Sequence, residues 1–393
     1  MTSPIDPLQQ LITGCVNVHS KAELQAKLKL GRPLRVKLGV DPTSSDIHLG
    51  HTVVFQKLRQ FQELGHQAVL IIGDYTTMIG DPSGRSTTRP HLSLEQILEN
   101  AKTYQSQAFK VLDPEKTELR FNSEWLAPMK FADVIKLNSR VTLQQMLQRE
   151  DFRNRVDQGH AIHLHELQYP VMQGWDSVMV QADVELGGTD QLFNLLVGRD
   201  LQREEKQEQQ IVMTMPLLVG LDGVQKMSKS LGNFVGVDEA PTGMFGKLMS
   251  ISDELMETYY NLLLGEQLDA SLHPMEAKKS LAERIVARYH SAAAAKEARA
   301  DFELRFSKRD LESAELPDYA PAADVPRDMI SLVVDAFQQC FKITKSRGDA
   351  RRLIEGGSVM WRGEKISDVK AMIEVDVEGV LKLDRKNAVR IKK

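Results

Sequence analysis

Cysteine is scarce in this chain, which has only Cys15 and Cys340 among its 393 residues. Two cysteines are too few for a disulfide framework or a cysteine-based zinc site. No apolar run approaches the roughly 18 residues that a membrane-spanning helix needs, and the first residues lack the basic and apolar regions of a secretory signal. We therefore expect a cytoplasmic protein with no membrane partner.

A large excess of charge of either sign is also missing, because 50 Lys and Arg stand against 54 Asp and Glu. The net charge of −4 argues weakly against a nucleic-acid partner. The distribution of the charges indicates the opposite. Residues 332–393 carry 14 basic and 9 acidic side chains, a net of +5, which leaves −9 for residues 1–331. This asymmetry predicts a nucleic-acid contact in the C-terminal part.

The order of strand-like and helix-like segments predicts a parallel α/β sheet. Residues 34–40 alternate apolar and basic side chains like a strand, and residues 49–65 carry apolar side chains at helical spacing. Residues 68–73 are wholly apolar, which is typical of a strand buried on both faces. Together these segments form a βαβ unit. Two further strands are expected at residues 177–184 and 210–215.

Most of the remaining chain has helical patterns. Helices are expected over much of residues 95–157 and over residues 246–264, 274–306, 328–340 and 346–356. Three prolines among small residues indicate a linker within residues 311–327. Short strand-like runs with glycine turns follow the last of these helices.

The motif His48–His51 (HLGH) lies where the turn after the first strand enters the first helix. Its two imidazoles share one face of the first helical turn. Free backbone N–H groups and the helix dipole favour an anion there, and Gly50 leaves room for a nucleotide. The tetrapeptide alone is equally compatible with two surface histidines, and a metal pair lacks a third ligand at suitable spacing.

The motif Lys226–Ser230 (KMSKS) lies on a loop after a glycine turn. Two lysines three residues apart among Ser and Gly suit a mobile cationic flap that binds a polyphosphate. A solvated basic loop is the ordinary interpretation of this pentapeptide alone. With His48–His51 upstream on a βαβ unit, the pair of motifs favours nucleotide chemistry.

The two motifs together resemble the HIGH-type and KMSKS-type signatures of the class I aminoacyl-tRNA synthetases. That resemblance implies a Rossmann-type catalytic domain, the fold class that the βαβ pattern indicates independently. Tyr169, Gln173 and Asp176 fall on one stripe of an otherwise apolar helix. The stripe resembles the amino-acid pocket of the tyrosyl members of the class, although an amphipathic helix with a wet face has the same spacing.

Further stretches of the chain resemble the tyrosyl enzymes, so that the resemblance extends over essentially the whole sequence. These stretches are Gly39–Thr43, Ile79–Gly84 and Gly187–Gln191. The resemblance implies that L-tyrosine and ATP, with Mg²⁺ on the phosphates, give tyrosyl-adenylate and pyrophosphate, and that tyrosine then passes to tRNA(Tyr). It also implies a homodimer with an interface in the region Phe121–Gly159.

The resemblance implies a role for each residue that matches the family's motifs. A catalytic role is implied for Thr43, His48, His51, Lys226 and Lys229. ATP binding is implied for Asp41, Gly50, Arg85, Arg89, Gly188, Asp190, Met227 and Lys229. Tyrosine binding is implied for Lys37, Gly39, Asp81, Tyr169, Gln173, Asp176 and Gln191. No metal ligand from the protein is implied.

Lys37 departs from the pattern of many bacterial members, which have a tyrosine at this position that shares recognition of the substrate hydroxyl. The departure indicates another bacterial branch of the tyrosyl enzymes. A lysine beside Asp176 would keep that carboxylate ionised, because an opposite charge favours the charged form. We therefore expect an ion pair between these two residues.

The C-terminal part resembles the S4-type RNA-binding domain that ends bacterial tyrosyl enzymes. Its basic helix start suits backbone phosphates and comprises Lys345, Arg347, Arg351 and Arg352. The expected domains are a Rossmann-type catalytic domain (1–235, with a helical insertion at about 121–160), an α-helical anticodon-arm-binding domain (236–312), a linker (313–327) and a small α+β S4-like domain (328–393).

Three other interpretations remain open from the sequence. A tryptophanyl enzyme shares the fold, but the stripe of Tyr169, Gln173 and Asp176 argues against it. A small nucleotidyltransferase also has an HxGH helix start, but lacks a KMSKS loop followed by helices. A paralogue that binds RNA without catalysis would not need both motifs intact. ATP–pyrophosphate exchange with each amino acid separates these interpretations.

Overall fold

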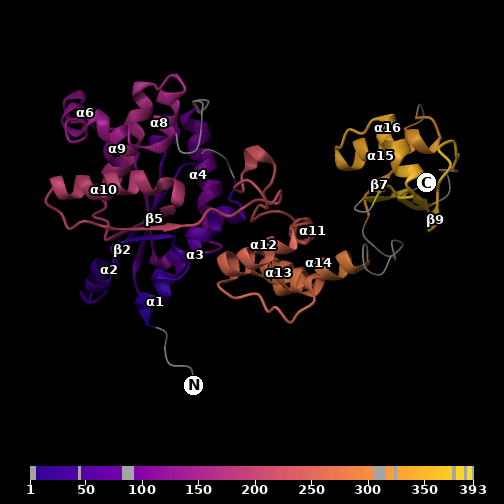
Figure 1. The fold of residues 1–393 in the computed structure, drawn as a ribbon, viewed down its shortest axis with the longest axis horizontal. Helices are drawn as coiled ribbons and strands as arrows, with labels where there is room; N and C mark the ends of the chain where they lie inside the picture. The colour runs from indigo at the N-terminus through magenta and orange to yellow at the C-terminus, as the bar shows by residue number, and fades with distance from the viewer. Residues whose placement is uncertain are drawn as a thin grey trace. The chain divides into compact units, whose positions relative to one another are not determined.

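The computed structural model describes residues 6–42, 46–81, 93–304, 316–322, 325–373, 378–384 and 387–391. The chain forms two compact units (Figure 1). The first comprises Met1–Ala240 and Lys247–Tyr289, and the second comprises Pro241–Gly246 and His290–Lys393. No helix in the described part of the chain is long and apolar enough to cross a membrane.

A six-stranded sheet forms the centre of the first unit, with the strand order β1-β6-β5-β2-β3-β4. Its strands are β1 (Asn17–His19), β2 (Arg35–Val40), β3 (Gln67–Ile72), β4 (Thr117–Phe121), β5 (Val184–Gly188) and β6 (Ile211–Met215). All neighbouring pairs are parallel except β1 and β6. The predicted parallel α/β sheet is confirmed, as are its strands near residues 34–40, 68–73 and 210–215.

The direction in which the chain winds reverses between β2 and β5. Helix α3 (Leu49–Glu63) leads from β2 to β3, whereas α10 (Leu192–Glu204) leads from β5 to β6 on the other side of the reversal. Because parallel crossovers are right-handed, the two helices cover opposite faces of the sheet. Helix α9 (Leu164–Met179) packs against α10, and Figure 1 shows both on one side of the strands. In such sheets ligands bind at the carboxyl ends of the strands beside the reversal.

The strand predicted at residues 177–184 is wrong. Ser177 and Val178 belong to the last turn of α9, and β5 begins only at Val184. A short apolar run does not distinguish a buried helix end from a buried strand. Between the two elements the chain turns at Gln181, whose φ is +50°.

Strand β4 interrupts the region 95–157 that the sequence predicts as mostly helical. The helices of that region are α4 (Leu94–Ala108), α5 (Ser123–Leu126), α6 (Phe131–Asn138), α7 (Leu143–Met146) and α8 (Glu150–Asp157), joined by turns and loops. Two short helices, α1 (Pro7–Ile12) and α2 (Lys21–Leu28), precede β2. The helical insertion therefore follows a strand at the edge of the sheet.

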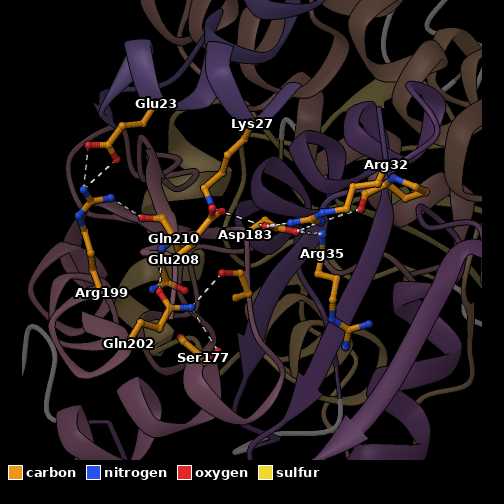
Figure 2. Close-up of polar contacts among 12 residues, drawn as sticks. Glu23, Lys27, Arg32, Arg35, Ser177, Asp183, Arg199, Gln202, Glu208 and Gln210 are labelled. Atoms are coloured by element: carbon orange, nitrogen blue, oxygen red, sulfur yellow. Dashed lines mark hydrogen bonds and ion pairs between the residues drawn. The ribbon is translucent and has the colours of Figure 1, made fainter. Parts of the chain in front are cut away.

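A polar cluster fixes the amino ends of β2 and β5, opposite the crevice. Arg32 donates to both carboxylate oxygens of Asp183 (2.7 and 2.8 Å), the backbone N–H of Arg35 donates to the same carboxylate (2.9 Å), and Lys27 lies 3.5 Å from it (Figure 2). Burial raises the pKa of Asp183, but these donors outweigh burial and hold the pKa below its ordinary value. The cluster fixes β2 and β5, the two strands between which the direction of winding reverses.

The helices predicted after residue 245 are present. They are α11 (Pro241–Met249), α12 (Asp253–Tyr259), a π-helical turn at Tyr260–Leu264, α13 (Pro274–Tyr289) and α14 (Ala292–Phe302). The second unit continues with α15 (Met329–Phe341) and α16 (Arg347–Glu355), as predicted.

The C-terminal part also contains a small sheet with the strand order β7-β11-β10-β8-β9. Its strands are β7 (Asp318–Tyr319), β8 (Met360–Trp361), β9 (Glu364–Lys365), β10 (Gly379–Lys382) and β11 (Ala388–Ile391). The predicted linker is wrong at β7, because Tyr319 is buried in the core of this domain and its hydroxyl donates to Asp335 (2.7 Å). A proline-rich composition did not reveal that one strand is recruited from this segment.

Candidate active site

Gly39 lies one residue before the carboxyl end of β2. Gly39 is exposed although its neighbour Leu38 is buried, and a Cβ at Gly39 would meet no heavy atom within 4 Å. The missing side chain therefore leaves open space beside the reversal between β2 and β5.

Asp176 lies on the buried side of α9, with 3% of its surface exposed. Its Oδ1 accepts a hydrogen bond from Nε1 of Trp125 (2.8 Å), and its Oδ2 accepts one from Nδ2 of Asn122 (3.3 Å). Burial raises the pKa of Asp176 to about 7, although the positive charge of Lys37 and both of these donors lower it. The carboxylate is thus held in a fixed orientation and close to its titration point at neutral pH.

Tyr169 lies seven residues before Asp176 on the same helix and faces the carboxyl end of β2. Its hydroxyl donates to Oδ2 of Asp41 (2.8 Å), and the hydroxyl of Thr76 donates to Oδ1 of Asp41 (2.9 Å). The amide of Asn122 donates to Thr76 (3.1 Å). A continuous hydrogen-bonded chain therefore joins the end of β2 to the donors of Asp176.

A second polar chain surrounds the amide of Asn194 on α10. Its Nδ2 donates to the side-chain oxygens of Gln173 (2.8 Å) and Gln191 (3.2 Å), and its Oδ1 accepts from Arg149 (3.0 Å). Gln191 in turn donates to Oδ2 of Asp81 (2.7 Å), and Arg149 lies 3.4 Å from Oδ1 of the same carboxylate. This arrangement places carbonyl and carboxylate acceptors together, which suits an ammonium group.

The two histidines of the HLGH motif form the start of α3. Nδ1 of His48 accepts from the backbone N–H of Gly50 (3.2 Å), and Nδ1 of His51 accepts from the backbone N–H of His48 (3.2 Å). The rings stack with their centroids 3.8 Å apart. A Cβ at residue 50 would lie 3.0 Å from atoms of the His48 ring, so a larger residue there would require the ring to shift.

Both imidazoles are neutral, with the ring proton on Nε2. Burial, the neighbouring His51 and Lys229 lower the pKa of His48 to about 2, and burial with the two loop lysines lowers the pKa of His51 to about 4. Because each Nδ1 accepts a backbone hydrogen bond, the ring proton of each histidine must sit on Nε2. Two neutral donors at a helix N-terminus suit phosphate oxygens.

The two lysines of the KMSKS motif are paired with carboxylates near the same edge. Nζ of Lys226 lies 2.9 Å from Oδ2 of Asp190, and Lys229 pairs with Asp46. These pairs are partly exposed, so each contributes little to stability. An incoming anion can therefore replace Asp190 or Asp46 as the partner of its lysine with only a small loss of stabilising free energy.

The chain that follows the KMSKS motif is fixed against the start of α3. The backbone N–H of Leu49 donates to the carbonyl of Val235 (2.9 Å), and that of Val237 donates to the carbonyl of Ile47 (3.0 Å). Met227 is buried, with its backbone N–H donating to the carbonyl of Leu218 (2.7 Å). These contacts hold both motifs at one place although the sequence separates them widely.

Comparison with known proteins identifies the family. The model of the "tRNA synthetases class I (W and Y)" family matches residues 29–307. A tyrosine--tRNA ligase of Oleidesulfovibrio alaskensis is 50% identical over 98% of both chains, and one of Aquifex aeolicus is 49% identical over 99% of both chains. The chain belongs to the class I tyrosine--tRNA ligases.

Solved structures of the family share the fold. The tyrosyl-tRNA synthetase from Archaeoglobus fulgidus, complexed with L-tyrosine, has a TM-score of 0.60 at 22% identity and covers 75% of this chain and 98% of its own. A C-terminally truncated mitochondrial tyrosyl-tRNA synthetase from Aspergillus nidulans has a TM-score of 0.62 at 20% identity, over 76% of this chain and 93% of its own. Identity this low supports the architecture alone.

The expected ion pair between Lys37 and Asp176 is wrong. Nζ of Lys37 instead contacts Oε1 of Glu185 (2.7 Å), Oγ of Ser177 (2.7 Å) and the carbonyl of Gln173 (2.9 Å). An ammonium group has three donors, and all three are used inside the protein. Lys37 has no exposed surface, so its predicted direct contact with tyrosine is also wrong.

The other predicted site residues of this family member fall into three groups. The tyrosine-site residues at the crevice are Gly39, Asp81, Tyr169, Gln173, Asp176 and Gln191, and the nucleotide-site residues near it are Asp41, His48, Gly50, His51, Gly188, Asp190, Lys226, Met227 and Lys229. Thr43, Arg85 and Arg89 lie outside the described residues. The assigned roles of all of these residues remain predictions.

Sequence reasoning missed five polar side chains that complete the site. They are Thr76, Asn122, Trp125, Arg149 and Asn194. Each follows or lies on an element of ordinary composition, and each meets its partner over a long sequence separation. The one available signal was position, because Asn122 and Trp125 directly follow β4 at the carboxyl edge of the sheet.

Proposed function

We propose that the chain ligates L-tyrosine to tRNA(Tyr) in two steps at this crevice. The observation that carries the proposal is that a buried acceptor for a phenol, Asp176, shares one strand edge with two neutral imidazole donors and two loop lysines. The first group suits the amino acid and the second suits a polyphosphate. The membership of the family supports the same reaction.

In the first step the carboxylate of tyrosine attacks the α-phosphate of ATP. A bond forms between the carboxylate oxygen and phosphorus, the bond to the pyrophosphate oxygen breaks, and tyrosyl-adenylate remains. In the second step a ribose hydroxyl at the 3′ end of tRNA attacks the carbonyl carbon and AMP leaves. The first step needs no general base, because the attacking carboxylate is already ionised at neutral pH.

Catalysis of the first step is electrostatic. Negative charge moves onto the β- and γ-phosphates as the bond to pyrophosphate breaks. Nε2–H of His48 and of His51 would donate to these oxygens, and Lys226 and Lys229 would exchange Asp190 and Asp46 for them. Neutral imidazoles have the advantage that the site does not depend on proton uptake in the physiological range, since both pKa values lie far below it.

Mg²⁺ would enter with ATP and neutralise charge on its phosphates. Among the residues that the structure describes, no cluster of three or more His, Cys, Asp or Glu side chains could hold a metal ion. A metal that is ligated mainly by substrate phosphates and water fits such a site.

The amino acid is proposed to lie with its phenol toward Asp176 and its ammonium toward the acceptors around Asn194. Tyr169, Gln173 and Asp81 supply oxygen atoms to the ammonium. A pocket built to pair a buried carboxylate with a phenol rejects phenylalanine by about 10⁴–10⁵, because the carboxylate would be left without its partner. The ligase therefore needs no editing site against phenylalanine.

ATP–pyrophosphate exchange tests this proposal. The chain should support exchange with L-tyrosine, and neither L-tryptophan nor L-phenylalanine should replace it. Charging of tRNA(Tyr) with radiolabelled tyrosine tests the second step. Exchange with tryptophan alone, or with no amino acid, would contradict the proposal.

We also propose that the C-terminal domain binds tRNA. The proposed domains are those that the sequence predicts, with catalysis in residues 1–235, anticodon-arm docking in 236–312 and an S4-like RNA-binding domain in 328–393, to which β7 from the predicted linker is added. Two of the predicted cations are paired, because Arg347 faces Asp328 (3.5 Å) and Arg352 faces Asp349 (2.5 Å). Arg351 is exposed beside them on α16, so it is the cation best placed for a phosphate.

Replacing Arg351 and Arg352 with alanine should weaken tRNA binding mainly at low salt. Two lost phosphate contacts reduce the slope of log K against log salt by about 2. Nitrocellulose filter binding over a salt series measures this slope, and tyrosine-dependent exchange should not change. Arg203→Ala, on the exposed face of α10, is a matched control. An unchanged slope in the double variant would rule out the proposed contact.

A homodimer is proposed from an apolar surface in the helical insertion and the start of α9. Its exposed apolar side chains are Phe131 (79%), Ile135 (56%), Leu143 (56%), Val156 (52%) and Leu164 (82%). Apolar side chains that gather at the surface mark interaction sites more often than chance. A second copy of the chain is the proposed partner, with the interface in the predicted region Phe121–Gly159.

The proposed location is the cytoplasm.

The variant Phe131→Asp combined with Leu164→Asp should be monomeric. Charges buried without partners in an apolar interface oppose association. Sedimentation velocity at micromolar concentration should show one species of about half the mass of the parent protein. Leu272→Asp, an exposed apolar position outside the insertion, should leave the mass unchanged. A dimeric double variant would place the interface elsewhere.

A further inference from the structure

Lys37 and Glu185 form an ion pair inside the fold, between β2 and β5. The two residues are register partners on neighbouring parallel strands, and neither side chain has any exposed surface. Taking two charges out of water costs free energy that their attraction returns only in part. A contribution to the stability of the fold is therefore a weak explanation for this buried ion pair, and we looked for a role in the function of the site.

The pair is bonded to the turn of α9 that carries the amino-acid site. Nζ of Lys37 donates to the carbonyl of Gln173 (2.9 Å) and to Oγ of Ser177 (2.7 Å), and Ser177 donates to Oε2 of Glu185 (2.8 Å). Gln173 and Ser177 lie three residues before and one residue after Asp176. Contacts from β2 and β5 therefore restrain the turn of α9 that carries Asp176.

The network behind Asp176 is closed against solvent. Nε2 of Gln210 donates to Oε2 of Glu185 (2.5 Å), and the backbone N–H of Gln210 donates to Oε1 of Gln202 (2.7 Å). Gln202 donates to the carbonyl of Ala182 (2.9 Å) and reaches that of Ser177, as Figure 2 shows for the labelled side chains. Charges in such surroundings are weakly screened and act on their neighbours over several ångströms.

The groups that act on Asp176 come from three other elements. Lys37 on β2 lowers its pKa, Trp125 and Asn122 after β4 lower it by hydrogen bonds, and Glu185 on β5 raises it. Asp41 is connected to Asp176 through Thr76 and Asn122. The two charges of the buried pair therefore act on Asp176 in opposite directions.

We propose that the buried Lys37–Glu185 pair is a positioning element that sets the charge and orientation of Asp176, and through it the selection of tyrosine over phenylalanine. The inference rests on the proposed function, since it assumes that Asp176 receives the phenol.

Equilibrium binding of L-tyrosine between pH 5.5 and 8.5, measured by calorimetry without ATP, tests the proposal. The carboxyl and phenol groups of free tyrosine titrate outside this range, and its amino group titrates only toward the upper end. In the parent protein, affinity should fall on acidification, and at pH 6 should be about tenfold below that at high pH, because only the fraction with ionised Asp176 binds. Asp176→Asn should abolish this step, which assigns it.

Single substitutions in the pair should move the midpoint of this step in opposite directions. Glu185→Gln leaves the positive charge of Lys37 alone and should lower the midpoint by about one pH unit, whereas Lys37→Met should raise it by a similar amount. The double variant should return toward the parent midpoint. Loss of packing alone would weaken both single variants in the same way, so opposite shifts separate an electrostatic role from a structural one.

Midpoints that coincide in the parent protein and both single variants, or that shift in the same direction, would overturn the inference. If one single variant does not fold by circular dichroism, the other and the double variant still decide the sign. Tyrosine-dependent exchange in the parent protein is measured in parallel. If exchange activity is present but the midpoints do not shift, only this inference is contradicted. If exchange activity is absent, both the proposed function and the inference are contradicted.

Discussion

Replacing Asp176 with asparagine is expected to lower kcat/KM for tyrosine in ATP–pyrophosphate exchange by on the order of 10². Hydrogen bonds to a charged partner contribute about 1.5–3 kcal/mol, and the amide also presents an N–H group toward Trp125 or Asn122, both of which are donors. Activity with phenylalanine should rise, because its ring no longer leaves a buried carboxylate without a partner. The ratio of the two kcat/KM values should therefore fall by about 10³ or more.

A matched control for this substitution exists in the same neighbourhood. Asp74 is also buried, and its carboxylate accepts from the backbone N–H and the hydroxyl of Ser123 (2.9 and 2.6 Å). Asp74→Asn disturbs the same turn after β4 without removing the phenol acceptor, so it should lower stability but preserve selectivity. Equal loss of selectivity in both variants would show that Asp176 does not read the hydroxyl.

Replacing Lys229 with alanine is expected to slow tyrosyl-adenylate formation by on the order of 10²–10³. The lysine lies beside the stacked imidazoles, where its charge contributes to the low pKa values of both. It would meet the phosphates most closely when charge moves onto them, so kcat should fall while the dissociation constant for tyrosine stays within about twofold. Single-turnover quenched flow measures the rate, and equilibrium dialysis measures the affinity.

Lys247 supplies the comparison for this second variant. Its ammonium lies over the same Phe234 ring as Lys229 (4.8 and 6.0 Å), but it pairs with Glu239 (2.6 Å) and not with Asp46. Lys247→Ala should retain adenylate formation. An undiminished rate in Lys229→Ala, or an equal loss in Lys247→Ala, would remove Lys229 from the proposed machinery.

Much of the fold was predictable because its signals are local. The apolar run of β3 and the helical spacing of α3 are visible within short windows, and both elements occur where expected. The boundary between α9 and β5 was not predictable, because the buried end of a helix and a buried strand have the same composition. Strand β7 was missed for a related reason, since a two-residue strand has no period.

The active site was predictable only where a motif carries its own geometry. His48 and His51 cap the helix that contains them, so four residues of sequence fix their stacking and their tautomers. The same holds for the spacing of Tyr169, Gln173 and Asp176 along α9. In contrast, Trp125 meets Asp176 across 51 positions, and no local pattern indicates such a contact.

The sequence by itself determined the parallel sheet, the two motifs at its edge and the residue types that we propose to bind a nucleotide and a phenol, because these follow from local spacing. The scarcity of cysteine excluded a disulfide framework and a cysteine-based zinc site. The small net charge argued against a nucleic-acid partner, but the basic C-terminal part indicated one. Only the tertiary structure decided the partner of Lys37. Register between β2 and β5 places Glu185 beside it, and a buried ammonium with three acceptors at hand has no donor left for Asp176.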